Sequence, residues 1–283
     1  LAHHLLVLDD AEKPEYLLKV LVAATGTKSI VFFSTADQVN FFHALLPAVQ
    51  SPFDERPLLP AAPLKIHGYM QPRERKEIFA AFAAMERGVL LTTDVGSRGL
   101  DFAGVQLVLL YDPPPALKDY VNRVGRTARM FAAGVALSFV FETESEYATH
   151  LTAEFAAREV SKAAVSALVT PLRWDLQIRR AVQAAGLNHA ARRAFVSFCR
   201  AYSLLGDRQR FNLKALNLHR LARSLGLEGA KASAETAAPG YRHAQDAKTL
   251  SRSEQGFLEH KHRAAMLGAR RTATRDFANR EFM

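Results

Sequence analysis

The chain has 283 residues, of which 49% are hydrophobic, and a formal net charge of +9. This length is enough for about two domains with ordinary cores. A single cysteine excludes a disulfide framework, and no apolar run reaches the roughly 18 residues that a membrane span needs. The charge is uneven, because residues 1–150 carry 14 basic and 17 acidic side chains, whereas residues 151–283 carry 23 and 11. A basic second half of this kind indicates an appended segment that binds nucleic acid.

The first half of the chain alternates between two patterns. Apolar, β-branched runs typical of buried strands cover residues 30–35, 66–70, 88–91, 105–111 and 134–141. Helical spacing of apolar residues covers 36–49 and 73–85. Strands that alternate with helices of this length predict an α/β fold with a parallel sheet covered on both faces.

Hydroxyl and glycine residues stand at the ends of several predicted strands. Ser34 and Thr35 close the first run, His67 and Gly68 lie in the second, and Thr92–Ser97 follow the third. In open α/β sheets, ligands bind at the carboxyl ends of the strands. We therefore expect these segments to meet along one edge of the sheet.

Three arginines follow at intervals of three residues, at positions 123, 126 and 129. If the segment is helical, they lie on neighbouring parts of one surface. Guanidinium groups match phosphate oxygens with two parallel hydrogen bonds, so an anionic target such as a nucleotide phosphate or a nucleic-acid backbone is favoured. Taken alone, a segment of this kind is more often a solvated basic helix end.

The second half of the chain shows only helical patterns. They cover residues 151–168, 174–185, 189–205 and 212–225, and Gly226 is predicted to cap the last one. The aromatic residues at helical spacing are expected to form a small core rather than a platform for RNA bases; they are Phe195, Phe198, Tyr202 and Phe211. Cys199 is expected to pack in the same core. The histidines lack the spacing of metal ligands, so no metal site is predicted from them.

Five segments combine into one specific signal. They are SIVFFST (29–35), IHGYM (66–70), TTDVGSRGLDF (92–102), LLYDPP (109–114) and NRVGRTAR (122–129). In this order and at this spacing, residues 1 to about 145 resemble the second RecA-like lobe of DEAD-box RNA helicases. The resemblance implies a RecA-like parallel sheet flanked by helices, with ATP and RNA as ligands.

The resemblance also assigns residues to the nucleotide. Arg126 and Arg129 match the two arginines that reach the γ-phosphate of ATP and neutralise charge in the transition state of phosphoryl transfer. Asp101 matches the carboxylate that accepts from the ribose hydroxyls. Arg98 and Gly99 match residues of the nucleotide site, and Arg98 also helps to join the two lobes.

A second group of matched residues is assigned to RNA. Thr35, Gly68, Thr93 and Gly96 match positions that bind RNA phosphates through hydroxyl and backbone N–H groups, where small residues let the backbone come close. Arg75 matches a further contact on the RNA side. Such contacts read the RNA backbone and its 2′-hydroxyls, not the base sequence.

The chain departs from the family pattern at two positions. Asn122 stands where the family has a histidine that links the arginine segment to the first lobe, and asparagine cannot be protonated near neutral pH. Pro72 stands where the family has a glutamine, three residues before Arg75. Asn122 favours weaker ATP-driven coupling, whereas Pro72 puts one contact on the RNA side in question.

A looser resemblance covers the second half. Residues 194–202 and 216–227 resemble the helical C-terminal extension of nucleolar DEAD-box helicases that act in ribosome assembly. Basic side chains supply its surface for RNA phosphates; they are Arg192, Arg193, Arg200, Arg208, Arg210, Lys214, Arg220 and Arg223. We therefore expect a lobe over residues 1–145, a helical extension over 146–230 and a basic, largely irregular tail over 231–283.

The function expected from these resemblances is an ATP-dependent RNA helicase or RNA-remodelling ATPase of ribosome assembly, in particular of the large subunit. The sequence holds neither a phosphate loop of the form GxxxxGK[ST] nor an Asp-Glu-Ala-Asp motif. We expect these, and most of the Mg²⁺ ligands, on a first lobe outside this chain, so the chain alone should be inactive.

The expected partners are pre-ribosomal RNA and ribosomal or assembly-factor proteins, with no membrane. The nucleolus is the expected location, and the mitochondrion is the alternative. Two other functions stay open: a non-catalytic RNA-binding assembly factor on a helicase fold, which Asn122 and Pro72 favour, and a helicase directed at DNA.

Overall fold

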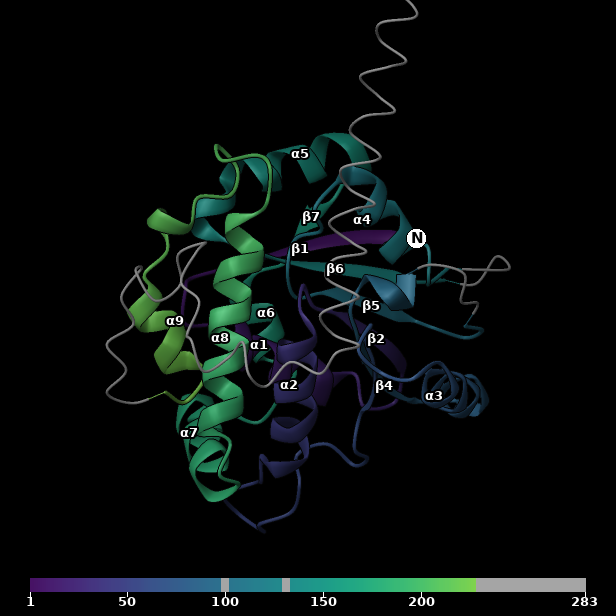
Figure 1. Ribbon diagram of the computed structural model, residues 1–283, viewed down its shortest axis with the longest axis vertical. Coiled ribbons are helices and arrows are strands. Elements are labelled where there is room, and N and C mark those ends of the chain that lie inside the picture. The colour runs from purple at the N-terminus through teal and green to yellow at the C-terminus, as the bar shows by residue number, and fades with distance from the viewer. Residues whose placement is uncertain (98–101, 129–132, 228–283) are drawn as a thin grey trace, which may run out of the picture. The chain divides into compact units, whose positions relative to one another are not determined.

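Seven strands form one parallel sheet in the order β3-β4-β2-β5-β6-β1-β7 (Figure 1). The strands are β1 (Ala2–Leu8), β2 (Lys28–Phe32), β3 (Leu64–Ile66), β4 (Gly88–Thr92), β5 (Leu107–Leu110), β6 (Val135–Phe141) and β7 (Arg158–Glu159). Every paired neighbour runs parallel, which confirms the predicted α/β class. β2, inside the sheet between β4 and β5, is buried at all five positions, as expected for a strand covered on both faces.

The structure is a computed structural model that describes residues 1–97, 102–128 and 133–227. Four residues of the predicted nucleotide site, Arg98, Gly99, Asp101 and Arg129, lie outside the described residues, as does the predicted tail over 231–283.

The helices fall into two groups along the chain. Those between the strands are α1 (Lys13–Ala23), α2 (Ala36–Ala48), α3 (Pro72–Ala84), α4 (Leu117–Val124) and α5 (Ser145–Phe155). Those after the sheet are α6 (Lys162–Ser166), α7 (Trp174–Ala184), α8 (Asn188–Ser203) and α9 (Leu218–Ser224). Short 3₁₀ turns are η1 (Asp94–Ser97), η2 (Glu142–Glu144) and η3 (Leu213–Ala215). None of the helices in the described ranges is both long and apolar enough to cross a membrane.

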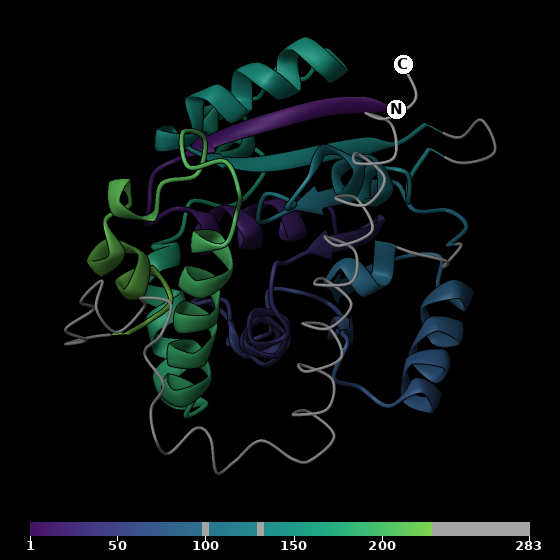
Figure 2. The ribbon, with the colours of Figure 1, turned by 45° about the horizontal axis from the view of Figure 1, so that its top comes forward.

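The later helices form a further layer on one side of the sheet. α8 packs along α2, and α6, α7 and α9 pack against α1, whereas α5 lies on the opposite side of the sheet beside β6 (Figure 2). The layer therefore packs mainly on helices of the lobe, and α6 also contacts β1.

Two predicted strands are displaced. The predicted strand over 66–70 is confined to Leu64–Ile66, and a turn closed by the N–H of Met70 on the carbonyl of His67 follows it, at 3.2 Å. The run over 30–35 ends as a strand at Phe32. In both cases the strand stops earlier than predicted, which leaves the polar residues in the loops beyond the sheet.

The predicted continuous helix over 151–168 is wrong. Helix α5 ends at Phe155, because Ala156 adopts a left-handed conformation with φ of 53°. The chain then adds β7 to the sheet, where Arg158 pairs with His4, before Ser161 caps the short helix α6. Alanine-rich spacing predicted one helix, but pairing with the free edge of β1 overrode the local preference.

The predicted helix over 212–225 is also interrupted. The turn η3 is separated from α9 by Leu216, whose backbone is extended, and Asn217 then caps α9 by accepting from the N–H of Arg220. Gly226 follows with φ of 81°, as the cap prediction requires. A Cβ at Gly226 would also meet the side chain of Val182 at 2.9 Å, so both conformation and space call for glycine.

The aromatic residues of the extension are buried, as predicted, but they do not form a separate core. The ring of Phe141, from β6, contacts both Phe198 and Tyr202, and Phe211 contacts Tyr147 of α5. Cys199 is fully buried beside them, and burial raises the pKa of its thiol to about 12. The predicted division at residue 146 stays a prediction; both sides of it share one hydrophobic core.

Candidate functional site

The carboxyl ends of four neighbouring strands lie at one edge of the sheet. The register places Thr92 opposite both Ile66 and Phe32, and Phe32 opposite Leu110. The segments beyond these residues therefore begin side by side; they are Ser34–Thr35, His67–Gly68, Thr93–Ser97 and Asp112. The expected meeting of the strand-end segments is confirmed, and we call this set the strand-end edge.

The space around the backbone differs between the two glycines of the strand-end edge, Gly96 and Gly68. A Cβ at Gly96 would lie 2.5 Å from the Thr92 hydroxyl oxygen, so the turn η1 folds too tightly over β4 for any larger residue. The Thr92 hydroxyl is itself fixed, because it donates to the carbonyl of Ile66 at 2.8 Å. At Gly68, by contrast, the nearest atom to a Cβ is a Val95 methyl at 3.7 Å, an ordinary contact. Within the described part of the chain, packing does not require a glycine at position 68.

Thr35 lies in the loop between β2 and α2 and is the N-cap of α2. Its hydroxyl oxygen accepts from the N–H of Gln38 at 3.2 Å, and the Gln38 side chain accepts from the N–H of Thr35 at 3.1 Å, which is a complete capping box. The same hydroxyl lies 2.8 Å from the hydroxyl of Ser197 on α8. One residue of the predicted RNA contacts is therefore joined directly to the extension.

Arg123 does not share a surface with the other arginines. Its side chain is fully buried, with Nε donating to the Asp94 carboxylate at 2.7 Å and Nη1 donating to the carbonyl of Asp112 at 2.9 Å. Its guanidinium also lies over the ring of Phe32. The interpretation that three arginines point at one external target is wrong for Arg123, which ties η1 to the end of β5.

Arg126 lies just beyond the end of α4 and is half-buried. Its Nε donates to the carbonyl of Asn122 at 3.1 Å, so the guanidinium folds back along the last turn of the helix. Arg75 lies on α3, half-buried, one turn after Pro72, which occupies the first helical position where proline is favoured. Pro72 therefore has a structural role at the start of α3, which the departure from the family pattern did not suggest.

A buried group of charges lies beneath the strand-end edge, and the sequence reasoning missed it. Lys13 is 1% exposed; its ammonium donates to the carbonyl of Tyr111 at 3.1 Å and stands 3.7 Å from the centre of the Phe141 ring. Burial lowers its pKa, and the charges of Glu144 and Asp112 oppose that shift. No pattern around Lys13 marks it, because its partners come from loops about 100 or more residues away.

The two carboxylates of this group are also fully buried. Burial raises the pKa of Asp112 and of Glu144, while the charge of Lys13 acts in the opposite direction on both. Asp112 accepts from the N–H of Ser34 at 2.9 Å, and Glu144 accepts from the hydroxyl of Tyr202 at 2.7 Å. The group therefore connects the strand-end edge to α8.

A small cavity opens at the same place. It has a volume of about 20 Å³ and is lined from the lobe by Lys13, Gln38 and Phe42 and from the extension by Phe198 and Leu221. This is room for about one water molecule. A nucleotide does not fit there, so the cavity is a packing feature of the seam between lobe and extension.

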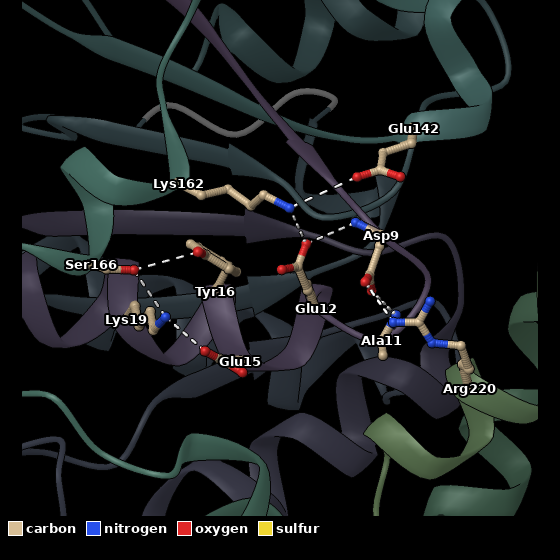
Figure 3. Close-up of polar contacts among 10 residues, drawn as sticks. All are labelled: Asp9, Ala11, Glu12, Glu15, Tyr16, Lys19, Glu142, Lys162, Ser166 and Arg220. Atoms are coloured by element: carbon tan, nitrogen blue, oxygen red, sulfur yellow. Dashed lines mark hydrogen bonds and ion pairs between the residues drawn. The ribbon is translucent and has the colours of Figure 1, made fainter.

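Polar contacts hold the extension to the loop after β1 (Figure 3). Arg220 of α9 pairs with Asp9 at 2.6 Å, and Lys162 of α6 pairs with Glu12 at 2.9 Å, which raises the pKa of that lysine. The Lys19 ammonium donates to the Ser166 hydroxyl at 3.0 Å. These pairs flank the buried seam and fix the relative position of α1, α6 and α9.

The predicted basic residues of the extension are exposed, apart from the half-buried Arg210. Among the described residues, Arg193 pairs with Asp37, Arg210 with Asp207, and Arg220 with Asp9. In residues 1–97, 102–128 and 133–227, no cluster of three or more His, Cys, Asp or Glu side chains could hold a metal ion. The Mg²⁺ implied by the resemblance therefore finds no ligand set among the described residues.

Two family profiles match the chain. The helicase conserved C-terminal domain matches residues 12–131, and the C-terminal extension of ATP-dependent rRNA helicases that are SPB4-like matches residues 185–232. The first match contains the whole strand-end edge, and the second begins in the loop before α8 and contains all of α8 and α9.

Several curated relatives are similar over most of this chain. DEAD-box ATP-dependent RNA helicase 18 of Oryza sativa subsp. japonica is 33% identical over 225 residues, which is 78% of this chain and 33% of that protein. ATP-dependent RNA helicase DDX55 of Xenopus laevis is 32% identical over 80% of this chain and 36% of its own length. This chain thus spans about one third of the relatives that it matches.

Solved structures support the fold. Domain 2 of the DEAD-box helicase Mss116p, bound to an RNA duplex, aligns with a TM-score of 0.62 and 22% identity over 80% of this chain and 86% of that one. Mss116 bound to single-stranded RNA and UDP-BeF aligns with the same TM-score and 21% identity, over 80% of this chain and 44% of that one. At this identity the likeness shows the RecA-like architecture alone.

Proposed function

Because this chain carries the helicase conserved C-terminal domain and an SPB4-like C-terminal extension, and its homologues are DEAD-box RNA helicases, we propose that it forms the second lobe and extension of an ATP-dependent RNA-remodelling enzyme. The observation that carries the proposal is the register that brings the strand-end segments to one edge. We further propose that the enzyme acts on pre-ribosomal RNA during assembly of the large subunit, in the nucleolus, with the mitochondrion as the alternative location.

In this proposal, the strand-end edge binds RNA phosphates. Thr93 and the backbone of Gly96 lie next to Gly68 along the edge, and Gly68 is small without an internal steric reason. An approaching phosphate supplies such a reason, since close approach of an external group to the backbone favours glycine. Arg75 adds a cation on the neighbouring helix, and Thr35 adds a hydroxyl.

ATP is proposed to bind between this lobe and a first lobe that carries the phosphate loop. Arg126 and Arg129 then approach the γ-phosphate from this side, and Asp101, Arg98 and Gly99 contact the ribose and the nucleotide. Support comes from Arg126, which already stands at the end of a helix anchored to the strand-end edge through Arg123. Mg²⁺ is proposed to be held by the first lobe, so this chain by itself is inactive.

The test is RNA-stimulated ATP hydrolysis by the protein that carries this chain together with a first lobe. Arg126→Ala and Arg129→Ala should each lower turnover on the order of a thousandfold, because arginine fingers neutralise charge that develops only in the transition state. Arg56→Ala, in an exposed loop, is the matched control and should leave turnover unchanged. Unchanged turnover in both finger variants would contradict the proposal.

A second candidate is a non-catalytic RNA-binding assembly factor, favoured by Asn122 in place of histidine. The structure supplies a local role for Pro72, so Asn122 is the remaining observation on this side. Asn122→His should raise RNA-stimulated turnover if the enzyme is active but weakly coupled. Wild-type protein that binds RNA and hydrolyses no ATP with or without RNA would establish the non-catalytic function instead.

A DNA-directed helicase is the third candidate. Binding of RNA and DNA oligonucleotides of the same sequence separates it from the other two. Contacts to 2′-hydroxyls predict tighter binding to RNA.

A further inference from the structure

Besides the buried charged group, the extension contacts the strand-end edge at the start of α2. Ser197 and Arg193 stand one turn apart on α8 and reach Thr35 and Asp37 respectively, two residues apart at the start of α2. α8 packs against α2, and the two helices are neighbours in Figure 1. The two contacts therefore act on the same short segment that is proposed to face RNA.

The contact between Thr35 and Ser197 decides where the hydroxyl proton of Thr35 points. The Thr35 hydroxyl carries one proton and has two acceptors within reach inside the protein, the side-chain oxygen of Gln38 at 3.0 Å and the Ser197 hydroxyl oxygen at 2.8 Å. If Ser197 is the donor, its proton turns from the Ala194 carbonyl, which lies 3.1 Å away, to the Thr35 oxygen. The Thr35 oxygen then accepts from both Ser197 and the N–H of Gln38, and the Thr35 proton can turn from the Gln38 side-chain oxygen toward an external phosphate. Chains of hydrogen bonds of this kind strengthen one another.

The second contact concerns a charge. Asp37 lies two residues after Thr35, and its carboxylate would repel any phosphate bound nearby, since charges interact over roughly 8–10 Å at physiological salt. The Arg193 guanidinium pairs with it at 2.7 Å. Arg193 remains 62% exposed, so it covers the carboxylate while presenting positive charge to solvent.

We propose that α8 of the extension prepares the segment between β2 and α2 for RNA binding. Ser197 orients the Thr35 hydroxyl, and Arg193 neutralises Asp37, so both are positioning residues for Thr35. This inference rests on the proposed RNA site, and it gives the extension a role within that site in addition to any RNA it binds elsewhere. The ligand is the phosphate backbone of single-stranded RNA, because hydroxyl and guanidinium groups recognise phosphate without reading bases.

The experiment measures binding of a labelled oligouridylate to the full-length protein by fluorescence anisotropy, over a series of salt concentrations. Arg193→Ala should weaken binding roughly threefold to tenfold, since it removes a cation and exposes a carboxylate beside the RNA. Adding Asp37→Asn to this variant should restore most of the lost affinity. Ser197→Ala should weaken binding by roughly threefold, and Ser197→Thr, which keeps the hydroxyl, should bind as wild type does.

The chain offers matched controls for both changes. Ser203 on the same helix donates to the carbonyl of Arg200 three residues earlier, as Ser197 can donate to that of Ala194, and no described contact joins it to the lobe. Arg173 pairs with Asp175 within the extension at 3.4 Å, and its side chain is 74% exposed. Ser203→Ala and Arg173→Ala should leave RNA affinity unchanged.

The outcomes separate the inference from the proposed function. Wild-type protein that fails to bind RNA overturns both. Wild-type protein that binds RNA, with Arg193→Ala and Ser197→Ala binding equally well, overturns the inference and leaves the function standing. Weakened binding that Asp37→Asn does not restore contradicts charge neutralisation by Arg193.

Discussion

The sheet of the lobe and the helices of the extension bury their apolar residues in different ways. β2 is buried along its whole length, so its environment is complete within the lobe. α8 buries one face, with Phe195, Phe198 and Tyr202 turned inward, and exposes Arg192 and Arg193 on the other. The extension therefore adds positive charge to the surface, but it needs the lobe to cover its apolar face. The lobe supplies the geometry of the strand-end edge.

The largest effect is expected from removing Phe198, the ring that joins α8 of the extension to β6 of the lobe. Phe198→Ala should lower the free energy of unfolding by about 3–5 kcal/mol, because a buried ring that contacts Phe141 is lost and a cavity remains. Chemical denaturation followed by circular dichroism measures this. Leu204→Ala, at the exposed end of the same helix, should change stability by less than about 0.5 kcal/mol.

The same variant also asks whether the two regions unfold together. A shared core predicts one cooperative transition at lower denaturant in Phe198→Ala. Two separate transitions, with only the helical one shifted, would show that the extension folds independently of the lobe.

Removal of the buried cation tests the polar part of the seam. Lys13→Met should cost about 3 kcal/mol at neutral pH, since Glu144 and Asp112 are left as buried carboxylates without their cation. The loss should grow from about pH 4 upward. The raised pKa values of these carboxylates mean that the folded state holds protons that the unfolded state releases, so stability falls as pH rises through that window.

The control for this variant is Lys118→Met, an exposed position on α4, which should be nearly neutral at every pH. A Lys13→Met protein that is as stable as wild type at pH 7 would mean that the carboxylates are protonated or hydrated without the lysine.

Gly226→Ala tests the turn that ends helix α9. The left-handed backbone and the contact with Val182 should together cost about 1–3 kcal/mol, measured by thermal or chemical denaturation. Gly206→Ala is the matched control, because a Cβ there meets nothing within 4 Å and its φ is not in the left-handed region. Equal stability of the two variants would show that α9 shifts to accommodate a side chain.

The smallest expected effect lies at the strand-end edge itself. Burial lowers the pKa of His67, and the nearby charge of Lys65 adds to the shift. The unfolded state therefore binds a proton first as pH falls below about 6.5, and stability is lost there. His67→Gln should reduce the loss of stability between pH 7 and pH 5 by less than about 1 kcal/mol, measured by denaturation at both values. An unchanged pH dependence would contradict the burial of a neutral imidazole.

Much of the lobe could be predicted because its signals are local. A buried strand such as β2 is a continuous apolar run, and α2 begins at Thr35 with Gln38 three residues later, which is a capping box in the sequence itself. β1 and β7 were not predicted, and the helix over 151–168 was predicted wrongly. A two-residue strand has no period to detect, and it exists because the edge of β1 is there to pair with it.

The sequence by itself determined the order of the strand-end segments, and with it the RecA-like sheet and the edge where those segments meet. Only the tertiary structure decided which side chains serve that edge from within and which face outward. Arg123 and Arg126 are equivalent by spacing, yet Arg123 is buried against Asp94. Thr35 meets Ser197 across 162 residues. Periodicity assigns a residue to a face of its own helix or strand, but the partner on that face is set by packing between elements distant in the chain.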